Sequence, residues 1–253
     1  MLINLFVVGD EILSGRRQDR HLAKVIELLA ARGMELFGAE FLPDDEARIA
    51  ESIARVRARD EVLLCCGGIG ATPDDLTRQA AARAFEVPLA RHGEAEALIV
   101  AQYGERARPH RVRMADFPAG SGLIPNPVNR VPGFFLGHCY FVPGFPEMAW
   151  PMLEWVLDGP LAGLHRPQPP AQYALRVYGA AGEGDLLPMM EQLLREFPEV
   201  KLSSLPFRGD AARPPHIELG VKGPPPAAAA AWHWLRARLA HMPELRVEVL
   251  RAP

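Results

Sequence analysis

Cysteine is scarce in this chain. Among 253 residues there are three cysteines, Cys65, Cys66 and Cys139. Three thiols in apolar surroundings are too few for a disulfide framework, and their spacing does not match a zinc-ligand set. The scarcity excludes a disulfide-stabilised scaffold and favours a reducing, cytoplasmic compartment.

Long apolar runs and a strong excess of one charge are also missing. No stretch approaches the ~20 apolar residues that a membrane helix requires, and the formal net charge is −3. Such a chain exerts no long-range attraction on nucleic acid or anionic lipid. We therefore expect neither a membrane nor a nucleic-acid partner. The apolar run at 2–8 lacks a basic leader, so we interpret it as a strand rather than a signal peptide.

The composition is that of a globular protein with two domains. Apolar residues make up 49% of the chain and charged residues 23%, a balance typical of folded soluble domains. The length suits one large and one small unit. The segment 166–170 reads Arg-Pro-Gln-Pro-Pro, which cannot continue a helix. We therefore predict domains at 1–166 and 171–253.

Strands and helices alternate in the first domain, which predicts a three-layer α/β/α fold around a mostly parallel sheet. The strands expected there lie at 2–8, 34–42, 62–66, 122–124, 134–136 and 139–142. A later helix carries Met148, Met152, Trp155 and Val156, a stripe that we interpret as core packing. The second domain has the order βαββαβ, which predicts a small ferredoxin-like α/β sandwich.

The most informative segment, 66–77, reads Cys-Gly-Gly-Ile-Gly-Ala-Thr-Pro-Asp-Asp-Leu-Thr. It follows a buried strand, and a helix is expected to begin near Pro73. Glycines let backbone N–H groups face a ligand, and a helix N-terminus favours an anion. The segment therefore predicts a phosphate-binding loop at the carboxyl edge of the sheet. The expected contacts are Gly67, Gly68, Ile69, Gly70 and Thr72.

Two adjacent acids, Asp74 and Asp75, complicate this interpretation. Thr72 as N-cap, Pro73 at the first helical position and Asp75 bonding back would explain the segment without a ligand. That interpretation leaves Asp74 unexplained, because two carboxylates beside a phosphate would repel it. A divalent cation, Mg²⁺ or Co²⁺, shared by the carboxylates and the phosphate removes the conflict.

Further acids follow the other strands, Asp10 and Glu11 after the first and Asp44 after the second. Carboxylates from neighbouring strand ends can hold a metal ion and orient water for attack on a phosphoanhydride. We therefore expect Asp10, Asp74 and Asp75 as metal ligands, with Asp10 and Asp75 catalytic. The alternative is that Asp44 and Asp45 cap a helix and Glu11 is merely solvated.

The loop 126–133 is rich in hydrogen-bonding side chains. Asn126 and Asn129 are candidate ligand contacts, and Arg130 can bind a phosphate through two parallel hydrogen bonds. Ordinary turn chemistry explains Asn126 followed by proline equally well.

Three segments in order resemble the molybdopterin-binding fold family, and above all its CinA (competence/damage-inducible protein A) N-terminal branch. They are Val-Gly-Asp-Glu-Ile-Leu-Ser-Gly at 8–15, Gly-Gly-Ile-Gly-Ala-Thr-Pro-Asp-Asp-Leu-Thr at 67–77, and Val-Pro-Gly-Phe-Pro-Glu-Met at 142–148. The second domain resembles, more loosely, the small α/β domain that follows in CinA proteins. These motifs add Ser14, Pro143 and Gly144 to the expected ligand contacts.

The resemblance implies a domain that binds a pterin or a dinucleotide phosphate. Asp75 matches the aspartate considered essential in the adenylyltransferase branch, and Asp10 and Asp44 match other acidic positions. It further implies a metal-dependent nucleotide pyrophosphatase, a hydrolase acting on ADP-ribose-like dinucleotides or FAD. The alternative is a protein that binds or transfers molybdopterin without hydrolysis; a third hypothesis is a regulatory protein that keeps the loop for structural reasons. Because relatives self-associate, a homo-oligomer is expected.

Two departures bear on the substrate. Ile69 stands where the adenylyltransferase motif has threonine, and residues 129–133 read Asn-Arg-Val-Pro-Gly where many CinA proteins have Gly-Thr-Ala-Pro-Gly. The C-terminal amidohydrolase domain of full-length CinA is not matched, so nicotinamide mononucleotide deamidation is not expected.

Overall fold

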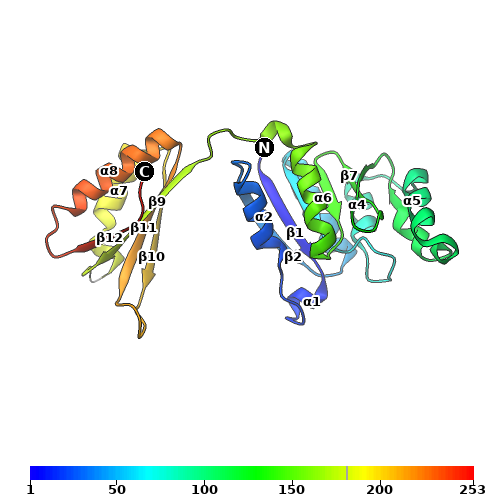
Figure 1. The fold of residues 1–253 in the computed structure, drawn as a ribbon, viewed down its shortest axis with the longest axis horizontal. Coiled ribbons are helices and arrows are strands. Elements are labelled where there is room, and N and C mark those ends of the chain that lie inside the picture. Colours follow the sequence, from blue (N-terminus) through cyan, green and yellow to red (C-terminus); the bar gives the residue numbers. More distant parts are fainter. Residues whose placement is uncertain (181) are drawn as a thin grey trace. The chain divides into compact units, whose positions relative to one another are not determined.

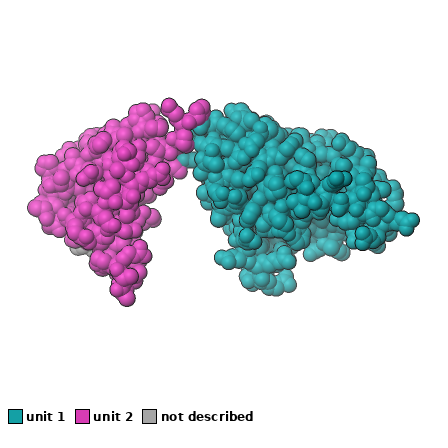
Figure 2. Space-filling model, viewed as in Figure 1, with its two compact units in different colours: residues 1–166 teal, residues 167–253 magenta. Residues whose placement is uncertain are grey.

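The structure is a computed structural model that describes residues 1–180 and 182–253. The chain divides into two compact units, Met1–Arg166 and Pro167–Pro253 (Figure 2). None of the helices in the described ranges is long and apolar enough to cross a bilayer.

A six-stranded sheet forms the centre of the first unit (Figure 1). Its order is β2 (Leu36–Leu42), β1 (Ile3–Val8), β3 (Val62–Cys66), β8 (Cys139–Val142), β7 (Gly133–Leu136) and β6 (Gly122–Ile124). The first four strands are parallel. Strand β7 runs antiparallel to β8, and β6 runs antiparallel to β7 and so returns to the direction of the first four. The prediction of a mostly parallel sheet is confirmed.

Helices cover both faces of this sheet. The core on one face includes α2 (His21–Ala30) and α6 (Pro146–Asp158); the core on the other includes α3 (Glu46–Ala58), α4 (Thr77–Phe85) and α5 (Gly93–Tyr103). In β1, Leu5 and Val7 belong to the first core and Phe6 and Val8 to the second. A strand buried on both faces needs apolar residues throughout, which explains its unbroken apolar run.

The region between α5 and β6 contains structure that the sequence did not indicate. Two 3₁₀ helices, Gly104–Ala107 and Arg111–Ala115, lead into β5 (Asp116–Pro118), which pairs antiparallel with β4 (Leu89–Arg91). Strands of three residues are too short to show a periodic pattern. This region supplies part of the wall of the cavity described below.

The second unit is a four-stranded antiparallel sheet in the order β10 (Lys201–Phe207), β11 (His216–Gly223), β9 (Ala171–Tyr178) and β12 (Arg246–Arg251). Helices α7 (Leu187–Glu196) and α8 (Pro225–Leu239) contribute Leu193, Trp232 and Leu235 to its core. This strand order is that of a ferredoxin-like βαββαβ sandwich.

Candidate functional site

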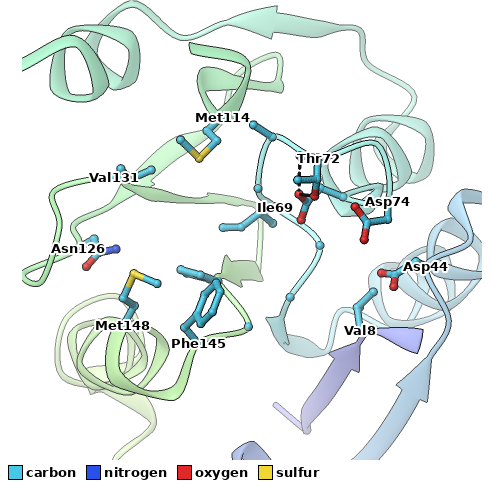
Figure 3. Close-up of a pocket in the computed structure, with 18 of the residues that line it drawn as sticks. Val8, Asp44, Ile69, Thr72, Asp74, Met114, Asn126, Val131, Phe145 and Met148 are labelled. Carbon is cyan, nitrogen blue, oxygen red and sulfur yellow. Dashed lines mark hydrogen bonds between the residues drawn. The ribbon is translucent and has the colours of Figure 1, made fainter. Parts of the chain in front are cut away.

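A cavity of about 560 Å³ lies at the carboxyl ends of β1, β3 and β8 (Figure 3). The end of β1, the glycine-rich loop after β3, the loop before β7 and the loop between β8 and α6 all contribute to its wall. This is the edge at which open parallel sheets bind ligands.

The glycine-rich loop is anchored to the rest of the unit. Gly67 donates its N–H to the carbonyl of Val142 at 3.0 Å, and Thr77 donates its N–H to the carbonyl of Gly68 at 2.9 Å. Gly67 and Gly68 have φ of +107° and +70°. A Cβ at Gly67 would overlap the carbonyl of Val8, and one at Gly68 would overlap the side chain of Thr77. Glycine is therefore required here by the loop itself, with or without a ligand.

A turn, not a helix, follows this loop. The Oδ2 atom of Asp75 accepts hydrogen bonds from the N–H of Thr72, at 2.8 Å, and from the hydroxyl of Thr72. The N–H of Asp75 returns a bond to the carbonyl of Thr72 at 3.1 Å. Helix α4 begins at Thr77, so the prediction of a helix start near Pro73 was wrong. The backbone beside the cavity therefore belongs to a loop and a turn rather than to the first turn of a helix.

Carboxylates concentrate on one side of the cavity. Glu11, Asp44, Asp74 and Asp75 all line it. Burial and the negative charges of Asp10, Glu11 and Asp74 raise the pKa of Asp44, against the lowering effect of a hydrogen bond from the N–H of Asp10. This acidic wall makes a bare phosphate unfavourable there unless a cation accompanies it.

The opposite side of the cavity is apolar (Figure 3). Met114, Val131, Phe145 and Met148 lie there, and Ile69 lies between them and the acidic wall. Flexible thioethers pack well against planar rings. The sequence analysis missed this apolar wall and assigned Met148 to the core. The buried members of that stripe are Met152 and Val156, and Trp155 is exposed.

Asn126 and Asn129 organise the loop before β7, which lines the cavity. Asn126 accepts a hydrogen bond from the N–H of Val128 at 3.0 Å and donates one to Oδ1 of Asn129 at 2.8 Å. The Nδ2 group of Asn129 contacts Sδ of Met148 at 3.1 Å, and a thioether is a weak acceptor. Asn126 thus stabilises the turn, as ordinary turn chemistry predicted. The side-chain amide of Asn129 still has an N–H that it can donate to a ligand in the cavity.

Most of the side chains and glycines expected at the site do line the cavity. They are Gly67, Gly68, Ile69, Gly70, Thr72, Asp74, Asp75, Glu11, Asp44, Asn126, Asn129, Pro143 and Gly144.

Three of the expected residues are not on the cavity wall: Asp10, Ser14 and Arg130. The Asp10 carboxylate accepts the N–H of Asp44 at 3.3 Å, and the Ser14 hydroxyl accepts from Nε of Arg16 at 3.2 Å. Arg130 has a left-handed φ of +60°, which turns the chain at that point.

Arg17 is a cavity residue that the sequence analysis overlooked. Among the described residues on the wall, it alone carries a positive charge. Its position in the loop after the first strand end was the available signal, because that edge of the sheet was already expected to bind the ligand.

The carboxylates of the cavity wall do not by themselves complete a site for a divalent cation. Within the described residues, no group of three or more His, Cys, Asp or Glu side chains could hold a metal ion. Asp10, Asp74 and Asp75 therefore do not form a complete protein-only site. Mg²⁺ is usually held by one or two carboxylates together with phosphates and water. Asp74 and Asp75, on one wall of the cavity, fit that mode.

Comparison with known proteins now identifies the family. Residues 4–163 match a family described as "Probable molybdopterin binding domain". The chain belongs to this family. A CinA-like protein of Desulfosudis oleivorans is 35% identical over 161 residues, which cover 61% of this chain and 39% of that protein. The chain thus spans well under half of that relative, and the resemblance to CinA-like molybdopterin-binding proteins is confirmed.

Two further proteins are similar to this chain. A protein of Pyrobaculum calidifontis is 28% identical over 251 residues, covering 95% of this chain and 94% of that protein. The crystal structure of CinA, of unknown function, from Thermoplasma acidophilum aligns with a TM-score of 0.58 and 26% identity. That alignment covers 62% of this chain and 98% of the Thermoplasma chain.

Proposed function

We propose that the cavity binds a molybdopterin-type ligand, a planar heterocycle that carries a phosphate. The observation that carries the proposal is that an apolar wall and a glycine-rich loop line the same cavity. The ring would pack between Met114, Met148 and Phe145, and backbone N–H groups of residues 68–71 would receive the phosphate. Membership of the molybdopterin-binding family supports the same proposal.

A second candidate function is the metal-dependent hydrolysis of a dinucleotide phosphoanhydride. The acidic wall favours it, since Glu11, Asp44, Asp74 and Asp75 would repel a phosphate that arrived without a cation. Both hydrogen bonds from Thr72 go to Oδ2 of Asp75. Oδ1 accepts no hydrogen bond within the described part of the chain, so Asp75 can contact an ion or a water molecule.

In that reaction each of these residues would have a distinct role. Asp74 and Asp75 would hold Mg²⁺ or Co²⁺, which supplies Lewis-acid polarisation of the phosphoanhydride when bound. The N–H groups of residues 68–71 would stabilise the charge that develops on the phosphate. Asp10, which is off the wall, would fix the position of Asp44. Cytoplasmic location and self-association are further proposals, from the scarcity of cysteine and from the family resemblance.

One experiment separates the two candidates. The purified protein is oxidised and assayed for a fluorescent pterin, then incubated with ADP-ribose or FAD and Mg²⁺ or Co²⁺ while AMP release is measured. A stoichiometric pterin without AMP release supports binding alone. AMP release that Asp75→Asn abolishes and Glu94→Gln preserves supports hydrolysis, because Glu94 is an exposed acid off the cavity. Neither pterin nor AMP, with no thermal shift for any of these compounds, would refute both.

A further inference from the structure

Three arginines lie close together in the segment between α1 (Asp10–Leu13) and α2. Arg16 donates from Nε to the Ser14 hydroxyl at 3.2 Å. The guanidinium of Arg20 lies over the ring of Trp150, 5.2 Å from its centroid. Arg17 alone of the three lines the cavity. Two of these arginines are therefore engaged by the protein itself, and the third lies beside the candidate ligand site.

The backbone fixes Arg17 next to the acidic wall. The N–H of Arg17 donates to the carbonyl of Glu11 at 2.9 Å, and the N–H of Gly15 donates to the carbonyl of Ile12 at 3.1 Å. Gly15 has a φ of +72°, which reverses the chain and brings residue 17 back toward the end of β1. The position of Arg17 beside the cavity thus follows from a closed turn and not from an extended loop.

The Arg17 guanidinium has no hydrogen bond or ion pair with any side chain in the described ranges. Glu11, Asp44, Asp74 and Asp75 share the cavity with it, yet none forms a salt bridge with it. A guanidinium near carboxylates ordinarily pairs with one of them. Here it is exposed and unpaired, so its fork of N–H donors is available to an anion on a ligand.

We propose that Arg17 binds the second phosphate of a diphosphate ligand and thereby selects diphosphates over monophosphates. The inference rests on the proposed function, because the first phosphate has to occupy the glycine-rich loop. That loop follows β3, and Arg17 follows β1, the neighbouring strand. Two adjacent anionic groups on one ligand can therefore reach the two loops at once. The planar fork of arginine suits phosphate oxygens through paired hydrogen bonds.

A ligand with one phosphate would leave this arginine without a partner. Among the heterocycles with phosphate that the proposed function admits, the inference therefore favours those joined to a diphosphate, such as a nucleoside diphosphate or a dinucleotide. A pterin with a single phosphate would use the apolar wall and the glycine-rich loop but not Arg17.

The test compares ADP with AMP, which share the ring and sugar and differ by one phosphate. Affinities in Mg²⁺ are measured by calorimetry for the wild type, Arg17→Met, Arg17→Lys and the control Arg16→Met. The wild type should bind ADP about tenfold more tightly than AMP, the size expected of one charge-assisted contact. Arg17→Met should bring the ratio of the ADP and AMP affinities close to one without weakening the binding of AMP. Arg17→Lys should retain part of the preference, and Arg16→Met all of it.

The same measurements contain the outcomes that would overturn the inference. A general electrostatic effect would weaken AMP and ADP by the same factor in Arg17→Met, and the ADP/AMP ratio would survive. A wild type that binds both nucleotides equally would also refute it. If neither nucleotide binds but a pterin copurifies, the role of Arg17 is wrong while the proposed function stands. If nothing binds, both fail. Unchanged melting temperatures are expected, because the Arg17 side chain makes no hydrogen bond or ion pair with the residues that the structure describes.

Discussion

Asp10 and Asp44 exchange hydrogen bonds, the backbone N–H of each donating to the carboxylate of the other. The N–H of Asp10 donates to Oδ2 of Asp44 at 2.9 Å, and the N–H of Asp44 donates to Oδ1 of Asp10 at 3.3 Å. The exchange joins the ends of β1 and β2 at the edge of the cavity. It also keeps two carboxylates close together, and that proximity contributes to the raised pKa of Asp44.

The first prediction is that Asp44 and its neighbour Asp45 affect stability in opposite directions. The folded-state pKa of Asp44 is raised above its ordinary value, so ionised Asp44 lowers the free energy of unfolding. This destabilisation is absent at acid pH, where the carboxyl group is protonated, and is complete above the folded-state pKa. Asp44→Asn should raise the melting temperature at pH 7 by about 2 °C, since the group is only partly buried. The gain should vanish near pH 4.

Asp45 provides the contrast. It is the N-cap of α3 and accepts the N–H of Arg48 at 2.9 Å. Asp45→Ala should lower the free energy of unfolding by about 1 kcal/mol at pH 7. Urea denaturation of both variants at pH 4 and pH 7 checks the pair. A destabilising Asp44→Asn at neutral pH would show that its bond to Asp10 outweighs the charge repulsion.

The sequence predicted the acidic side of the site better than the apolar side, for a physical reason. Glu11, Asp44 and Asp75 each follow a strand, and parallel strands bring their carboxyl ends to one edge. Met114 and Met148 belong to segments that meet only in the folded chain, and each is locally indistinguishable from a core residue. The helix start was misjudged because Thr72 and Pro73 form a good local cap signal, whereas the bond between Thr77 and Gly68 is tertiary.

The second prediction concerns the removal of metal. A divalent cation should relieve the repulsion among the wall carboxylates and let a phosphate enter. We expect ADP to raise the melting temperature in Mg²⁺ and to lose that effect in EDTA, because stabilisation by a ligand depends on its affinity for the folded state. Asp74→Asn should weaken the Mg²⁺ dependence, and Glu94→Gln should not. Equal thermal shifts by ADP with and without Mg²⁺ would contradict a cation-assisted site.

The third prediction is that Arg78 fixes the distance between the two walls. Arg78 is 5% exposed, and its guanidinium donates to the carbonyl of Gly70 at 2.6 Å and to the carbonyl of Arg113. It thereby joins the glycine-rich loop to the segment that carries Met114. Burial lowers the pKa of Arg78, and the charges of Asp116 and Asp75 oppose that effect.

Loss of this guanidinium would leave buried carbonyls without donors. Arg78→Met should therefore lower the free energy of unfolding by about 3 kcal/mol, and Arg78→Lys by less. Arg83→Met is the control on the same helix, where a pair with Glu46 at 3.9 Å is exposed; its effect should stay below about 0.5 kcal/mol. Urea denaturation measures all three. Equal effects of Arg78→Met and Arg83→Met would contradict a joining role.

The fourth prediction separates ligand contact from core packing on helix α6. Met148 is half-buried and lines the cavity, whereas Met152, one helical turn later, is fully buried. If the apolar wall holds a ring, Met148→Ala should weaken AMP binding about tenfold and leave the affinity for ribose 5-phosphate, which has no ring, unchanged. Met152→Ala should instead lower the free energy of unfolding by about 3 kcal/mol through the cavity it creates. Calorimetry and urea denaturation of both variants decide the matter. Equal losses of AMP and ribose 5-phosphate affinity in Met148→Ala would place the ring elsewhere, because a side chain that contacts only the ring cannot affect a ligand without one.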